Sequence, residues 1–158
     1  MAVFTLPLLA QVEKKRPEFT DYPVQQIYRG VPAAPVLNKD HQSFRTMIRR
    51  GAKTSIRFAG HYTVPMWGCG TGCSTFTIAD SISGKVYELM SVADLPFEWL
   101  QQQKRDMPER IEFRPDSRLL KINGCPNETN CGFYDYLIVD GKGLTLLRKE
   151  LLPKAFQP

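Results

Sequence analysis

The sequence has few of the residues and motifs on which enzymes most often rely. Only two histidines occur among its 158 residues, and neither a Gly-x-Ser-x-Gly elbow nor a phosphate-cradling glycine loop is present. Paired carboxylates for acid–base chemistry are not evident either. These absences favour a protein that binds rather than one that catalyses, and no catalytic residue, metal ligand or cofactor is expected.

Long apolar runs and long basic runs are also missing. No stretch is apolar for long enough to cross a membrane, and the longest basic run is the triplet Lys14–Arg16. The net charge of +5 would suit an acidic ligand, but no nucleic-acid-binding motif accompanies it. With 42% hydrophobic and 23% charged residues, the composition is that of a soluble globular protein.

The N-terminal part divides into an apolar start and a proline-rich stretch. Residues 1–10, MAVFTLPLLA, are interpreted as the remnant of a secretory signal, with a short N-terminal strand or a disordered start as the alternative. Residues 11–158 then have the length of a single domain. Within it, residues 11–37 predict an extended arm that lies across the domain.

Hydrophobic periodicity after the arm predicts an α+β fold with dominant strands. Residues 38–55 predict an amphipathic helix, on which His41 would be solvated, and residues 95–107 predict a second, short helix. Residues 56–67 alternate with a period of two, and further short strands follow with connections that suit an antiparallel β-meander. This alternation places five apolar or aromatic residues on one face of the predicted strand: Ile56, Phe58, Tyr62, Val64 and Met66.

An internal repeat refines this picture. Residues 67–89, WGCGTGCSTFTIADSISGKVYEL, align with residues 123–147, NGCPNETNCGFYDYLIVDGKGLTLL. Each reads as a strand ending in Gly-Cys, a polar loop, a second Cys, a strand closing on Asp, a glycine turn and another strand, so that Asp80 matches Asp140. The meander is therefore expected to contain two similar three-stranded, blade-like hairpin units, used in one curved sheet or in two sheets packed face to face.

The four cysteines fall in the repeat, on either side of each loop. Residues that face each other across an antiparallel pair are close enough for a disulfide, so Cys69–Cys73 and Cys125–Cys131 are the favoured pairs. Pairing between the two loops and a four-thiolate zinc site remain open, although the second spacing is wide for zinc. An even number of locally paired cysteines favours an oxidising compartment. A redox pair is disfavoured because a strand, not a helix, follows each loop.

The second histidine, His61, is the most interesting polar residue. Gly60 before it permits close backbone approach, and alternation puts His61, Thr63 and Trp67 on one face. A half-buried histidine bonded within the sheet is the simplest interpretation. The functional interpretation is a candidate binding surface composed of His61, Thr63, Trp67, Gly70, Thr71 and Gly72. On another strand, Asp135 is predicted to be a partly buried carboxylate that needs a partner.

The segments FAGHYTVPMWGCGTGC, IADSISGKVY and EFRPDSRLL resemble a family of small, mostly exported proteobacterial proteins of uncharacterised function. The resemblance runs from about Phe19 to Leu147, and FAGHY with WGCGxxC are its most specific parts. It implies an envelope location and a small mixed fold, and it carries no catalytic assignment.

Together these features favour a non-catalytic binding protein in the periplasm or outside the cell, with an inhibitor or immunity protein as one form of it. Its expected partner is an envelope protein or an acidic ligand. The alternative is a metal-binding or hydrolytic protein that uses His61 with the Cys69–Cys73 loop.

Overall fold

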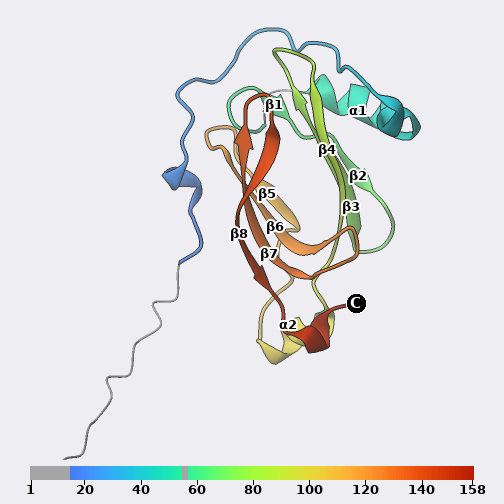
Figure 1. Ribbon diagram of the computed structural model, residues 1–158, viewed down its shortest axis with the longest axis vertical. Coiled ribbons are helices and arrows are strands. Elements are labelled where there is room, and N and C mark those ends of the chain that lie inside the picture. The colour runs from blue at the N-terminus through green and yellow to red at the C-terminus, as the bar shows by residue number, and fades with distance from the viewer. Residues whose placement is uncertain (1–14, 55–56) are drawn as a thin grey trace, which may run out of the picture.

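The alternating segments of the sequence form a sheet of antiparallel hairpins. The computed structural model describes residues 15–54 and 57–158, and within them eight strands join in one sheet (Figure 1). The sheet order is β1-β3-β4-β6-β7-β8, with β2 also paired to β3 and β5 also paired to β6. The strands are β1 (Tyr62–Thr63), β2 (Met66–Gly68), β3 (Cys73–Asp80), β4 (Val86–Ala93), β5 (Ile111–Phe113), β6 (Leu119–Pro126), β7 (Gly132–Val139) and β8 (Gly143–Leu151).

A narrow junction divides the sheet into two halves. Strands β4 and β6 pair only at Val92↔Pro126 and Ala93↔Cys125, whereas the hairpins on either side pair along most of their length. The inward side chains of both halves form one hydrophobic core, because every second residue of a strand points to the same face. This core includes Phe58, Tyr62, Phe76, Ile78, Tyr87, Ile122, Tyr134 and Ile138.

The two similar units expected from the repeat are confirmed. Strands β2, β3 and β4 form one three-stranded unit, and β6, β7 and β8 form the other. Disulfides join Cys69 to Cys73 and Cys125 to Cys131, each across the first hairpin of its unit. All four cysteines are therefore oxidised, and the pairing between loops and the four-thiolate zinc site are excluded.

The helices lie where the periodicity predicts them. A 3₁₀ segment, η2 (Lys39–Phe44), leads into α1 (Arg45–Ala52), which packs Ile48 and Ala52 against the sheet at 0% and 3% exposure. The short helix α2 (Phe97–Gln102) lies at the far end of the molecule, near the C-terminal segment (Figure 1). There it shares a second small core with residues that include Trp99, Cys125, Cys131 and Leu152. Two further 3₁₀ turns are η1 (Phe19–Asp21) and η3 (Lys154–Phe156).

Three details of the sequence prediction are wrong. His41 is buried rather than solvated, because its Nδ1 accepts the Asn38 N–H at 3.2 Å and completes the cap of η2. Residues 57–67 do not form one strand: Phe58 and Tyr62 close a tight hairpin, and Pro65 separates β1 from β2. Met66 is consequently 41% exposed, although Phe58, Tyr62 and Val64 do face the core. Ile56 and the signal segment 1–10 lie outside the described residues.

The described part of the proline-rich stretch, residues 15–37, is the extended arm that the sequence predicts. Backbone N–H groups along it donate to carbonyls of the sheet connections, Val24 to Asp116, Tyr28 to Gly60, and Val36 to Gly84. These hydrogen bonds hold three separate parts of the arm, so the arm lies along the surface of the domain.

One end of the arm is held by a buried ion pair. Asp135 on β7 is fully buried, and its Oδ1 accepts the Arg16 guanidinium at 2.6 Å. A second guanidinium, that of Arg148, lies 3.5 Å from Asp135. The prediction that Asp135 needs a partner is confirmed.

Candidate functional site

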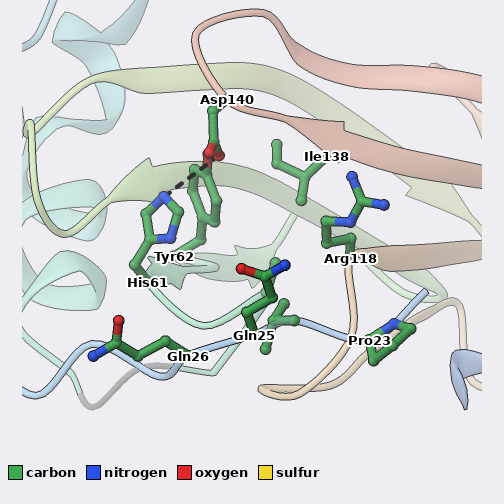
Figure 2. Close-up of a pocket in the computed structure, with 10 residues that line it drawn as sticks. Pro23, Gln25, Gln26, His61, Tyr62, Arg118, Ile138 and Asp140 are labelled. Atoms are coloured by element: carbon green, nitrogen blue, oxygen red, sulfur yellow. Dashed lines mark hydrogen bonds and ion pairs between the residues drawn. The ribbon is translucent and has the colours of Figure 1, made fainter.

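The arm, the FAGHY turn and the β7–β8 turn meet at one end of the sheet around an open hollow of about 420 Å³. Figure 2 shows His61 on one side, Arg118 on the other, and Gln25 and Gln26 along the arm. One wall of the hollow is formed by three side chains, the rings of His61 and Tyr62 and the carboxylate of Asp140. We call this site the His61 groove.

The FAGHY turn fixes the direction of His61. Phe58 and Tyr62 exchange two backbone hydrogen bonds, of 3.1 and 2.9 Å, across a three-residue loop. Ala59 and Gly60 both have positive φ, 47° and 81°, and Ala59 stores strain of about 1 kcal/mol in this conformation. The loop is held by the N–H of Gly60, which donates to the Pro115 carbonyl at 2.7 Å. Tyr62 therefore enters the core, while His61 stays at the surface with its ring against the Tyr62 ring.

Two carboxylates flank the imidazole of His61. Its Nε2 lies 3.5 Å from Oδ1 of Asp140 and 3.9 Å from Oδ1 of Asp80. The Tyr62 hydroxyl donates to Asp140 at 2.5 Å. Burial of the phenol, and next this hydrogen bond, raise the pKa of Tyr62 well above its ordinary value, so the group stays protonated and remains a donor.

The internal repeat explains why these carboxylates converge. Asp80 ends β3 and Asp140 follows β7, at equivalent positions of the two units. The two turns also touch directly, because Lys85 Nζ donates to the Gly141 carbonyl at 2.8 Å. Each unit thus contributes one carboxylate to the same imidazole.

The groove continues past the arm. A second hollow of about 610 Å³ shares Gln25, Gln26 and His61 with the first and is also lined by Ile27 and Ile82. Those two isoleucines are 40% and 56% exposed. The surface available to a ligand is therefore elongated, with polar groups near His61 and both apolar side chains and the exposed Arg29 in the second hollow.

The binding surface expected from the sequence is divided by the fold. His61 lines the groove, but Thr63 is fully buried, and Trp67 is stacked on Phe44 with ring centroids 5.1 Å apart. Gly70, Thr71 and Gly72 belong to the disulfide loop at the opposite end of β3. Strand β3 has eight residues, so its two ends lie about 23 Å apart.

The disulfide loop has a structural role in the fold. The Asp94 N–H donates to the Gly72 carbonyl at 2.9 Å, and the Asp94 carboxylate pairs with Arg110 at 2.5 Å. The Arg110 guanidinium also donates to the Ser74 hydroxyl. These bonds connect the loop to the β4–α2 connection and to the segment before β5.

Sequence reasoning missed Arg118, Gln25 and Gln26 as groove residues. The first is in a turn between strands and the others are in the arm, and no local pattern indicates that these segments meet. One signal did exist: the repeat aligned Asp80 with Asp140, and two matched acidic residues at equivalent strand ends could have been placed together.

Comparison of the chain with protein-family models, with curated proteins and with solved structures finds no match. Within residues 15–54 and 57–158, no group of three or more His, Cys, Asp or Glu side chains is arranged to hold a metal ion. No helix of the described chain is both long enough and apolar enough to span a bilayer.

Proposed function

We propose that the protein is a non-catalytic binding protein of the periplasm or the extracellular space, and that the His61 groove holds an extended, acidic segment of a partner polypeptide. An inhibitor or immunity protein would be one form of this function. The family resemblance in FAGHY and WGCGxxC agrees with the proposed location.

The unpaired Arg118 carries the proposal. Among the described residues, no carboxylate lies within 4.0 Å of its guanidinium, although it lines the same hollow as Asp140. A guanidinium offers a planar set of donors that match a carboxylate in two parallel hydrogen bonds. An acidic side chain of a partner would satisfy it in the groove.

The shape of the groove favours a polypeptide over a small molecule. Small-molecule sites are usually concave and enclose most of the ligand. Here two open hollows follow one another across the arm, with the side chains of Gln25 and Gln26 exposed between them. An extended chain could place one side chain in each hollow, and amides of glutamine could bond its backbone.

The alternative, a metal-binding or hydrolytic protein, has less support from the geometry. It combines His61 with the Cys69–Cys73 loop, and these lie at opposite ends of β3, with both sulfurs in a disulfide. Ser81, whose N–H donates to the His61 carbonyl, is only 2% exposed, so its hydroxyl is closed to a substrate.

Export is supported by cysteine chemistry. All four cysteines form disulfides, and such bonds persist mainly in oxidising compartments. Both bonds close short loops of the sheet and so stabilise the scaffold that carries the groove.

A selection from phage-displayed random dodecapeptides tests the proposal. Binding should enrich peptides that contain Asp or Glu, and Arg118→Glu should weaken the selected peptides by at least tenfold because it replaces the attraction with repulsion. Lys149→Glu, on the exposed part of β8, makes the same charge change outside the groove and should change affinity by less than twofold. A failure to enrich any peptide, or equal binding by the Arg118→Glu variant, would overturn the proposal.

A further inference from the structure

The positive charge of the chain is concentrated on the η2–α1 segment. Residues 39–53 contain five Lys and Arg residues and a single acidic residue, Asp40, so they hold +4 of the formal net charge of +5. The remaining sequence is nearly neutral. The five cations, all with exposed side chains, are Lys39, Arg45, Arg49, Arg50 and Lys53.

Apart from Arg118 and Arg29, which line the two hollows of the His61 groove, the other arginines of the described chain outside residues 39–53 are engaged in structural contacts. Arg16 and Arg148 pair with Asp135, and Arg110 pairs with Asp94. Three more, Arg57, Arg105 and Arg114, lie over aromatic rings. None of the five cations of residues 39–53 has an ion pair or a ring contact within the described chain.

The arrangement of these cations opposes helix stability. Arg45, Arg49 and Lys53 follow one another at intervals of four residues, about 6 Å along the axis, so like charges are neighbours on one side. The helix persists because its other side is anchored by Ile48 and Ala52 in the core and by Phe44 on Trp67. Packing therefore maintains a row of like charges whose repulsion is offset only in part by the favourable position of Arg49 and Arg50 in the last turn of α1.

We infer that the exposed face of α1, together with Lys39 at the start of η2, is a docking surface for an anionic phospholipid bilayer. It is a second interaction surface, separate from the His61 groove. The cations are complementary in charge to anionic headgroups, and such basic segments bind them with a strength that grows with each Lys or Arg near the surface.

The shape and composition of this face favour a bilayer over other anionic partners. The helix lies at the periphery of the molecule (Figure 1) and its cations are exposed, so a flat surface can reach them. Met47, 46% exposed on the same helix, can enter the headgroup region. The aromatic rings of Phe44 and Trp67 are stacked on each other, and so are not presented for stacking on the bases of a nucleic acid.

Vesicle co-sedimentation of the full chain tests this inference. Vesicles of 30% phosphatidylglycerol in phosphatidylcholine should bind the protein at 25 mM NaCl and release most of it at 300 mM, whereas pure phosphatidylcholine should not bind it. Arg49→Gln/Arg50→Gln should weaken binding about 30-fold, from the loss of two surface cations. The matched control, Lys149→Gln/Lys154→Gln, removes the same charge elsewhere and should stay within threefold of the wild type.

Three results would overturn the inference. One is the absence of binding to anionic vesicles at low salt. Another is an equal loss in both double variants, which would show that only net charge matters. The third is tighter binding of a 20-base-pair DNA duplex or of polyglutamate, which would assign the face to a nucleic acid or to an acidic protein. Circular dichroism of each variant checks that α1 remains folded.

Discussion

The arm forms one wall of the His61 groove, and substitution of Gly60 by alanine should show how tightly it is held. A Cβ atom at Gly60 would lie 2.4 Å from the Gln26 carbonyl oxygen, which belongs to the backbone and cannot rotate away. The arm would have to move outward and weaken the 2.7 Å hydrogen bond from the Tyr28 N–H to the Gly60 carbonyl. Gly141 provides a matched control, because its φ of 78° is close to the 81° of Gly60 and a Cβ there meets nothing within 4 Å.

The two substitutions share one cost and differ in another. Alanine at positive φ costs about 1 kcal/mol at either position. Only Gly60→Ala should add the loss of the arm contact, about 1–2 kcal/mol for one hydrogen bond and the displaced packing. We therefore expect the free energy of unfolding to fall by about 2–3 kcal/mol for Gly60→Ala and about 1 kcal/mol for Gly141→Ala.

Urea denaturation followed by tryptophan fluorescence measures both values, and amide hydrogen exchange locates the change. Exchange of the Tyr28 and Val24 N–H groups should accelerate in Gly60→Ala and not in Gly141→Ala. Equal destabilisation by the two variants, with unchanged exchange in the arm, would refute the idea that the arm is packed on the FAGHY turn.

Three further predictions concern the fold that supports the site. Asp135→Asn should lower the free energy of unfolding by at least about 3 kcal/mol in urea, because Arg16 and Arg148 lose their buried anion; a loss below 1 kcal/mol would contradict this. Replacing Cys69 and Cys73 by serine should cost about 2 kcal/mol, the chain entropy of so short a loop, without changing groove affinity; a tenfold loss of peptide binding would place the loop in the site. Because the pKa of Tyr62 is raised in the folded protein, only the unfolded chain ionises this phenol just above pH 10, so the free energy of unfolding falls as the pH rises further. Tyr62→Phe should reduce the slope of the free energy of unfolding against pH by up to about 1.4 kcal/mol per pH unit in alkaline denaturation. An unchanged slope would show that Tyr62 titrates normally in the folded state.

Local sequence patterns predicted much of the fold. Periodicity located α1, and the repeat between residues 67–89 and 123–147 indicated both three-stranded units and both disulfides. Those features depend on neighbours within about 25 residues, where hydrophobic alternation and turn residues act directly on the backbone. The turn FAGHY was misread as strand because alternation does not reveal the positive φ of Ala59 and Gly60.

The candidate site was only partly predictable, because it is assembled by tertiary contacts. His61 was identified, but its assumed neighbours Thr63 and Trp67 are covered by the core and by Phe44. Its real neighbours come from segments far along the chain, Asp140 on the second unit and Arg118 before β6. The two units meet beside His61 only because the sheet connects them at the narrow β4–β6 junction.

Backbone NMR can show whether the His61 groove is the recognition site of the protein. Amide shifts of the ¹⁵N-labelled protein are recorded while the tightest selected dodecapeptide is added. We expect the largest shift changes at Gln25, Gln26, His61 and Arg118, and we expect Arg118→Glu to abolish them. Shifts concentrated at the Cys69–Cys73 loop, or unchanged in the Arg118→Glu variant, would contradict this expectation.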